Sequence, residues 1–243
     1  MKGRFLVRSN EGPAEGNIYA DKSAIILDWL LRVGVKRQEF SLREVAKEIR
    51  VSLGLVQRVF GILVLKGLLQ TEGVRTAKKF FFKKSKRLLE SWLENYSIVK
   101  KCTMRTFHSS LQGKTEFLDA LKKNKLNQKV ALALHSAAEA HGYKNTNLNT
   151  LELYLLDPSV RPKLEKALQL EPQERGYEVL LIEPYYDNLL NRGVKSSKDV
   201  NVCPVLLTFL DLYHFPLRGQ EQAEFMVERN PELKWIYENG LRR

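Results

Sequence analysis

The stretch from Phe40 to Phe82 constrains the fold most, because it predicts two short capped helices followed by a strand, a turn and a strand. In FSLREVAKEI, Ser41 and Glu44 have the spacing of a capping box ahead of apolar residues at helical intervals. The second helix opens at Ser52, a good N-cap, and runs to Gly67, a plausible helix stop. This layout is that of a winged helix-turn-helix, which indicates duplex DNA as the partner.

The second of these helices has two faces of different character. Its apolar residues can face a core; they are Leu55, Val56, Val59, Phe60 and Leu63. The opposite face is left for solvent or for a groove of DNA. On that face we expect Gln57 and Arg58 to read base edges, because glutamine suits adenine and arginine suits guanine.

A basic hairpin and a basic helix start follow. The segment LLQTEGVRTAKKFFF predicts two strands around a turn at Gly73, with basic residues on or near the wing. The lysines after it open an amphipathic helix, and they could lie along phosphates or simply solvate the start of that helix. The predicted DNA-binding residues are Ser41, Arg43, Ser52, Leu53, Gly54, Gln57, Arg58, Arg75, Lys78, Lys79, Lys83 and Lys84.

Charge is distributed unevenly along the chain, whose net charge is +12. Residues 1–100 contain 20 Lys or Arg against 10 Asp or Glu, and the remainder contains 20 against 18. The first part therefore has a charge of about +10 and the rest about +2, which places the polyanion-binding surface in the N-terminal part. A solubilising basic face would give the same excess, but its coincidence with the helix-turn-helix layout favours nucleic acid.

At 243 residues the chain exceeds the usual size of one domain. We expect a flexible N-terminal arm over 1–22, a winged helix-turn-helix domain over 23–98 and an α/β regulatory domain over 99–243. No run of about 18 apolar residues could span a bilayer, and the start lacks the apolar centre of a secretory signal, so the sequence predicts a cytoplasmic protein without membrane contact. Cys102 and Cys203 belong to no metal-ligand cluster and are expected to be reduced.

The second domain alternates helical and strand-like segments, so the predicted fold class is α+β with a mixed α/β C-terminal domain. Residues 151–156 and 177–184 have the pattern of buried strands joined by a helix over 157–168. That unit would place the two strands side by side and parallel, unless another strand intervenes. The Ala-rich segment 129–142 is expected to be one helix closed by its final glycine.

No assembled catalytic or metal-binding motif occurs in the sequence: GxGxxG, a Walker loop, HExxH and GxSxG are all missing. His135 and His141 share a predicted helix at a spacing of six, which is wrong for chelation from one face. Glu183 and Asp187 could bind a metal near a strand end, but the further acids of a nuclease are missing, so we expect a structural or interfacial pair. The prediction is a protein that is not an enzyme and needs no metal or cofactor.

The turn between the last two predicted helices gathers charged residues. Asp211, Arg218 and Glu221 are close in sequence, and Arg218 is well placed to make a bidentate pair with a carboxylate. A buried corner that fixes the two helices is favoured over a catalytic cluster. A partner-binding surface stays open as an alternative, because charged turns often contribute to recognition.

Together these segments resemble the AbiEi family of bacterial transcriptional regulators, the antitoxins of type IV toxin-antitoxin systems. The likeness runs from VSLGLVQRVFGILVLKGLL through LLESWLENY and ELYLL to VLLTFLDLYHFPLRGQEQAEFM. Its most specific part comprises Asp211, Leu212, Tyr213, Arg218, Gly219, Glu221 and Ala223. The resemblance implies a repressor that binds inverted repeats in its own promoter, where two copies could dimerise on the DNA. It also implies that the protein counters a nucleotidyltransferase-type toxin without a stable complex.

Two other classes of function stay open. A ligand-sensing winged-helix regulator would release DNA when a small molecule binds the second domain. A DNA-targeted enzyme would show metal-dependent turnover that the loss of Glu183 and Asp187 abolishes.

Overall fold

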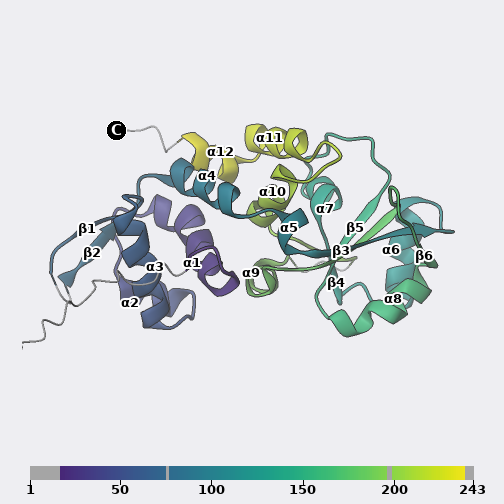
Figure 1. Cartoon of the computed structure of the whole chain (residues 1–243), viewed down its shortest axis with the longest axis horizontal. Helices are drawn as coiled ribbons and strands as arrows, with labels where there is room; N and C mark the ends of the chain where they lie inside the picture. Colours follow the sequence, from purple (N-terminus) through teal and green to yellow (C-terminus); the bar gives the residue numbers. More distant parts are fainter. Residues whose placement is uncertain (1–16, 75–76, 196–198, 239–243) are drawn as a thin grey trace, which may run out of the picture.

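The computed structural model describes residues 17–74, 77–195 and 199–238. Figure 1 shows a two-stranded sheet with the first helices toward one end of the molecule and a six-stranded sheet toward the other. The first elements are α1 (Asp21–Arg32), η1 (Gly34–Lys36), α2 (Leu42–Glu48), α3 (Leu53–Leu65), β1 (Gln70–Glu72), β2 (Lys79–Phe81), α4 (Ser85–Asn95) and α5 (Ile98–Lys101). The helix, helix and hairpin order expected between Phe40 and Phe82 is present.

A chain of aromatic rings holds these N-terminal elements together. Trp29 of α1 meets Phe40 edge to face at 5.0 Å between ring centroids, Phe40 meets Phe60 of α3 at 5.8 Å, and Phe60 meets Phe80 of β2 at 4.9 Å. The backbones of Phe40 and Phe80 also exchange two hydrogen bonds, of 3.1 and 2.9 Å. Each such ring pair contributes about 0.5–1.5 kcal/mol beyond its buried area. The hairpin is therefore fixed against the helices by its own aromatic residue.

The second part is built on a mixed sheet with the strand order β6-β3-β7-β5-β4-β8. Strands β5 and β7 are parallel neighbours, as are β4 and β8, and the other pairs are antiparallel. The elements are β3 (Thr103–Ser109), α6 (Gly113–Lys123), β4 (Val130–Leu132), α7 (Leu134–Ala140), β5 (Leu151–Leu155), η3 (Pro158–Val160), α8 (Arg161–Ala167), β6 (Leu170–Pro172), β7 (Val179–Glu183), α9 (Asp187–Gly193), β8 (Asn201–Val202), α10 (Val205–Tyr213), α11 (Gly219–Arg229) and α12 (Pro231–Glu238).

These elements confirm the α+β class and the parallel pairing of the strands predicted over 151–156 and 177–184. A further strand, β6, lies between them in sequence but pairs with β3 at the edge of the sheet. It therefore does not separate the two parallel strands.

The expectation of one helix over 129–142 is wrong. Val130, Ala131 and Leu132 form β4, which lies between β5 and β8, and α7 begins only at Leu134. The backbone of Leu134 has a φ of 45°, so the chain changes direction where a continuous helix would have passed. Residues in an internal strand are covered on both faces, and this burial overrides the helix propensity of an Ala-rich segment.

The last helix returns to the N-terminal helices, with α12 beside α4 in Figure 1. The Ser85 hydroxyl donates to the carbonyl oxygen of Ile236 at 2.7 Å, and Arg32 of α1 makes an ion pair with Glu232 at 3.0 Å. Helix α12 thus closes the outer side of α1 and α4.

Most of the expected N-terminal arm, residues 1–16, lies outside the described residues. Its last part is packed: Ile18 and Tyr19 are buried, and the hydroxyls of Tyr19 and Ser91 share a hydrogen bond of 2.6 Å. None of the described helices is long and apolar enough to cross a membrane.

Candidate nucleic-acid interface

The starts of α2 and α3 are capped as the sequence predicts. The Ser41 backbone N–H donates to the Glu44 carboxylate at 2.6 Å, and the Glu44 N–H donates back to the Ser41 hydroxyl at 3.3 Å. The backbone hydrogen bond from Ser41 lowers the pKa of Glu44. At the start of α3, the Leu55 N–H donates to the Ser52 hydroxyl at 3.2 Å. Ser41 and Ser52 are therefore engaged in shaping the two helices.

Helix α3 exposes the face that was expected to read bases. Gln57 and Arg58 are exposed, and neither side chain has a hydrogen-bond or ion-pair partner among the described residues. Gly54 and Gly61, one turn to either side, are exposed, and a Cβ added at either would meet nothing within 4 Å. Leu53 is exposed to 43% at the start of the same helix. The buried face comprises Val56, Val59, Phe60 and Leu63.

Two basic side chains of the hairpin beside α3 make contacts within the protein. Lys79 pairs with Glu39 at 2.9 Å, and this hydrogen bond raises the pKa of Lys79. The Lys78 ammonium lies 5.6 Å from the centre of the Phe80 ring. Arg75, predicted on the same turn, lies outside the described residues.

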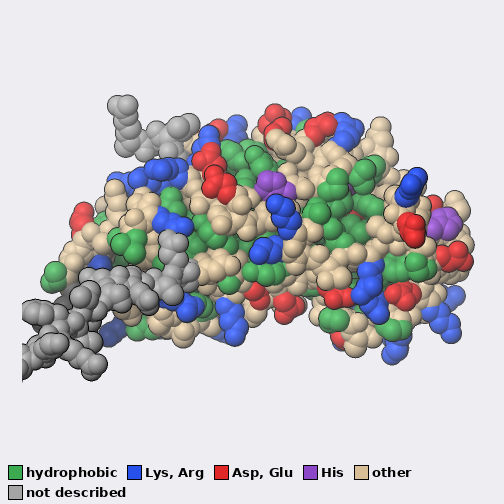
Figure 2. Space-filling view, viewed as in Figure 1, with side chains coloured by type: hydrophobic (Ala, Val, Ile, Leu, Met, Phe, Trp, Pro, Cys, Tyr) green, Lys and Arg blue, Asp and Glu red, His purple; other side chains and the backbone are tan. Residues whose placement is uncertain are grey.

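Basic side chains gather near the start of α4, at the upper left of Figure 2. Lys83 is exposed, and Lys84 donates to the carbonyl oxygen of Gly67 at 2.8 Å, just beyond the end of α3. Arg43 of α2 is also exposed. Four of the predicted DNA-binding residues with polar side chains, Arg43, Gln57, Arg58 and Lys83, are thus exposed and have no side-chain partner among the described residues.

One residue at this surface was missed by the sequence analysis. The guanidinium of Arg192, in the last turn of α9, donates to the carbonyl oxygens of Ile49 and Arg50, at 3.4 Å for the latter. These carbonyls belong to the end of α2 and to the turn before α3. No local spacing could have revealed a contact between groups 143 residues apart.

The charged corner between α10 and α11 contains the predicted bidentate pair, but not Asp211. The Arg218 guanidinium donates two hydrogen bonds to Glu221, one of 2.7 Å from Nε, and both side chains are exposed. Leu217 and Arg218 have φ values of 59° and 65°, and the buried His135 ring contacts the Leu217 carbonyl oxygen at 3.1 Å. This corner joins two helices, but its charged residues are exposed, so it is not the buried corner that the sequence analysis favoured.

Asp211 lies in the core instead. It accepts hydrogen bonds from the hydroxyls of Tyr96 at 2.7 Å and Tyr154 at 2.8 Å, and burial raises its pKa to about 7. Tyr96 follows α4 and Tyr154 lies in β5, so Asp211 joins the end of α4 to the central sheet. Asp211 and Arg218, grouped by sequence, have separate surroundings.

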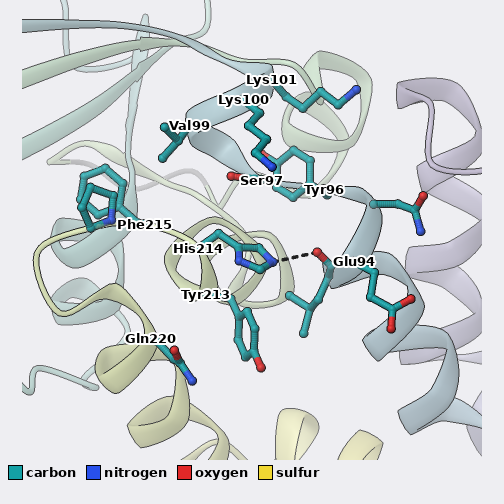
Figure 3. Close-up of a pocket in the computed structure, with 13 residues that line it drawn as sticks. Glu94, Tyr96, Ser97, Val99, Lys100, Lys101, Tyr213, His214, Phe215 and Gln220 are labelled. Atoms are coloured by element: carbon teal, nitrogen blue, oxygen red, sulfur yellow. Dashed lines mark hydrogen bonds between the residues drawn. The ribbon is translucent and has the colours of Figure 1, made fainter.

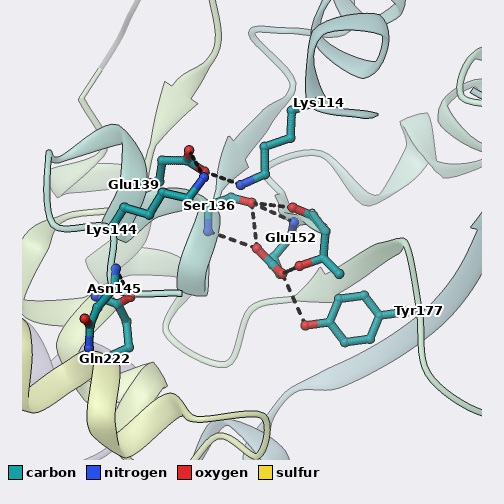
Figure 4. A network of polar contacts seen from close by, with 9 residues as sticks. Lys114, Ser136, Glu139, Lys144, Asn145, Glu152, Tyr177 and Gln222 are labelled. Carbon is teal, nitrogen blue, oxygen red and sulfur yellow. Dashed lines mark hydrogen bonds and ion pairs between the residues drawn. The ribbon is translucent and has the colours of Figure 1, made fainter. Parts of the chain in front are cut away.

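A second buried carboxylate, Glu152, is surrounded by neutral donors (Figure 4). It accepts from the Ser136 N–H at 2.9 Å and the Ser136 hydroxyl at 2.6 Å, from Thr150 at 2.5 Å and from Tyr177 at 3.2 Å. Its hydrogen-bonding capacity is thus met within the fold. This arrangement fits a structural network joining α7 to β5.

An open hollow of about 670 Å³ lies between the α4–α5 connection and the α10–α11 corner (Figure 3). His214 contacts the Leu93 carbonyl oxygen at 2.8 Å across it. Tyr213 and Phe215 contribute rings to the lining, and Lys100 lies on the side of α5. The hollow therefore combines apolar rings with a cationic group beside the connection between the two parts of the chain.

The pair considered for metal binding is engaged in other contacts. Glu183 makes ion pairs of 3.8 Å with both Arg105 and Arg161, and Asp187 accepts from Asn191 at 2.8 Å. In the described part of the chain, no group of three or more His, Cys, Asp or Glu is placed to hold a metal ion. Cys102 and Cys203 are both free thiols.

The model of one protein family, described as "Transcriptional regulator, AbiEi antitoxin, Type IV TA system", matches residues 82–231. Neither the curated proteins nor the solved structures gave a significant match. The matched region begins directly after β2 and ends at the first residue of α12. It therefore leaves α1 to β2, including the α2, α3 and hairpin part of the candidate interface, outside the match, while Lys83, Lys84 and Arg192 lie inside it.

Proposed function

The chain belongs to the AbiEi antitoxin family of transcriptional regulators from type IV toxin-antitoxin systems, and we propose that it represses its own operon by binding promoter DNA through a winged helix-turn-helix over 23–98. The observation that supports this most is the exposed face of α3. There, Gln57 and Arg58 project without partners among the described residues, between two glycines. Side chains able to read base edges on an uncovered helix are the requirement for recognition in the major groove.

Residues around Gln57 and Arg58 can make the other contacts that DNA binding needs, with base edges and with phosphates. With Gly54 and Gly61 on its outer face, α3 can approach base edges closely, and Leu53 offers an apolar contact for a thymine methyl group. Arg43 lies on α2 and Lys83 lies just before the start of α4, where they can neutralise phosphates. Residues 99–243 then serve regulation, and two copies of the chain occupy the two halves of an inverted repeat.

The test is binding to duplexes from the region upstream of the gene, compared with scrambled duplexes of equal length. Arg58→Ala should weaken the preferred duplex by about 1–3 kcal/mol and leave the scrambled one nearly unchanged, because a base contact contributes to specificity. Arg175→Ala removes the same charge from the exposed loop before β7 and is the matched control. If Arg58→Ala equals the control on both duplexes, α3 is not the recognition helix.

We further propose that the chain counters a nucleotidyltransferase-type toxin without a stable complex, as its family membership suggests. Co-expression with the toxin encoded beside it should restore growth, while the two proteins elute separately in size-exclusion chromatography. Co-elution would refute the absence of a complex, and unrelieved growth arrest would refute the antitoxin role.

A second candidate function is ligand-sensing repression, which the hollow beside the α4–α5 connection favours. A small molecule that binds there should raise the melting temperature of the full chain and release the preferred duplex. Both effects should be lost in Tyr213→Ala, whose side chain lines the hollow. A compound that releases DNA equally well from this variant does not act through the hollow.

A further inference from the structure

Helix α9 is capped by a residue from the N-terminal part of the chain. The Asp21 carboxylate of α1 accepts hydrogen bonds from the Asn188 N–H, at 3.1 and 3.2 Å to its two oxygens, and from the Leu189 N–H at 3.4 Å. The Asn188 side-chain amide donates to it at 2.6 Å. Amides at a helix start lack partners within the helix, so a carboxylate there is favourable. The start of α9 is thereby fixed to α1.

The other end of α9 is fixed to the turn that leads into α3. Arg192 donates to the carbonyl oxygens of Ile49 and Arg50. Carbonyl groups at a helix end have no intrahelical partner and a partial negative charge, which a guanidinium stabilises. Arg50 has a φ of 52°, a conformation that non-glycine residues seldom adopt without support from their surroundings. The Val51 N–H donates to the Ala46 carbonyl oxygen at 3.1 Å, and Arg192 adds two further donors at the point where the chain turns from α2 into α3.

Helix α9 also follows an internal strand of the large sheet after a short connection, residues 184–186. It follows β7, and the residue before α9, Tyr186, is buried between the two parts. The Tyr186 hydroxyl donates to the Tyr19 carbonyl oxygen at 2.9 Å and accepts from Trp92 Nε1 at 2.8 Å. Fixed contacts therefore connect β7 through Tyr186 and α9 to the turn before α3.

From these contacts we infer that Arg192 is a positioning residue for DNA recognition, and that α9 makes the orientation of α3 depend on the C-terminal sheet. The inference rests on the proposed binding of DNA by α3. Because Arg192 acts on backbone carbonyls, its loss leaves the charged side chains of the interface in place. The preference among sequences should therefore change, while the general attraction to duplex DNA should not.

The experiment compares full-length Arg192→Ala and Arg192→Lys with the wild type and with the charge-matched control Arg175→Ala. Affinities for the preferred and the scrambled duplex are measured over a series of salt concentrations. Arg192→Ala should lower the ratio of the two affinities by roughly tenfold, with an unchanged salt slope, since coupling between two sites typically changes an affinity by about 5- to 150-fold. Lysine can still donate to one carbonyl, so Arg192→Lys should recover part of the ratio.

Amide hydrogen exchange gives a readout that a loss of charge alone would not change. The amides of Leu55 and Val56, which donate to Ser52 at the start of α3, should exchange faster in Arg192→Ala and at the wild-type rate in Arg175→Ala. If Arg192→Ala does not fold, Arg192→Lys decides the question. Its affinity ratio and its exchange rates should lie between the wild-type values and those expected when the contact is lost.

Three outcomes would overturn the inference. An unchanged affinity ratio would show that α3 needs no support from Arg192. A salt slope reduced by about one would show that Arg192 contacts a phosphate itself. Unchanged exchange at Leu55 and Val56 would show that the turn holds its conformation alone. If the wild type does not discriminate between the duplexes, the proposed function fails. If the wild type discriminates and Arg58→Ala does not, the proposed function holds, and the Arg192 variants alone decide the inference.

Discussion

Replacement of Asp211 by asparagine should change how the stability of the protein depends on pH. Burial raises the pKa of Asp211 from 3.8 to about 7, although the hydroxyls of Tyr96 and Tyr154 favour the charged form. Between pH 3.8 and about 7, the folded protein therefore holds a proton on this group that the unfolded chain has already released. Over that pH range the free energy of unfolding falls as the pH rises. Above about pH 7 the contribution of Asp211 no longer changes.

The size of the effect follows from the same pKa values. A rise from 3.8 to about 7 corresponds to about 4 kcal/mol, because one pKa unit is about 1.4 kcal/mol. Asparagine has nearly the same shape and cannot ionise. The stability of Asp211→Asn relative to the wild type should therefore increase by up to about 4 kcal/mol between pH 4 and pH 8.

Urea denaturation followed by tryptophan fluorescence at several pH values measures this difference. Asp28, whose pKa burial raises to about 6, is present in both proteins, so its contribution cancels. Asp157→Asn is the control, because hydrogen bonds from Ser159 lower the pKa of Asp157 and the expected change has the opposite sign. A stability difference between Asp211→Asn and the wild type that is the same at pH 4 and pH 8 would refute the assignment of a raised pKa to Asp211.

Three further substitutions test the packing, the capping and the charge of the molecule. Gly219→Ala should destabilise the protein by about 1–3 kcal/mol in urea denaturation, because its Cβ would clash with the Leu212 carbonyl oxygen; wild-type stability would mean that the corner can relax. Ser52→Ala should cost about 1 kcal/mol in the same assay through loss of the N-cap of α3, and no loss would show that the cap is dispensable. Lys83→Ala should weaken all duplexes alike and reduce the salt slope by about one, and a sequence-selective loss would contradict a phosphate contact.

Local features of the fold could be predicted because their physical causes lie within a few residues. The capping box at Ser41 joins groups three positions apart, and the cap at Ser52 does the same. The parallel pairing of β5 and β7 followed from two buried strands with a helix between them. In each case the interacting groups, or the pattern that they impose, are visible in a short window of sequence.

The features that were missed depend on contacts across the chain. The helix expected over 129–142 is part strand because β5 and β8 supply hydrogen-bond partners that no local window contains. Asp211 was grouped with Arg218 by its place in the sequence, yet Tyr96 and Tyr154, its actual partners, lie 115 and 57 residues away. The exposure of Gln57 and Arg58 could be predicted from helical spacing, but the contact of Arg192 with the turn before their helix could not.

The family match and the α2–α3 part of the candidate interface cover different residues, but they are parts of one packed structure. Helix α4, which opens the matched region, packs against both α1 and α12, and α1 also packs against α9. The buried indole of Trp92 donates to Tyr186, which follows β7 of the matched region. A fragment ending at residue 98 would expose the apolar surfaces that α9 and α12 cover, at a cost of about 25 cal/mol for each Å². The orientation of α3 therefore depends on contacts made by the whole chain, and the proposed DNA binding should be tested on the full-length protein.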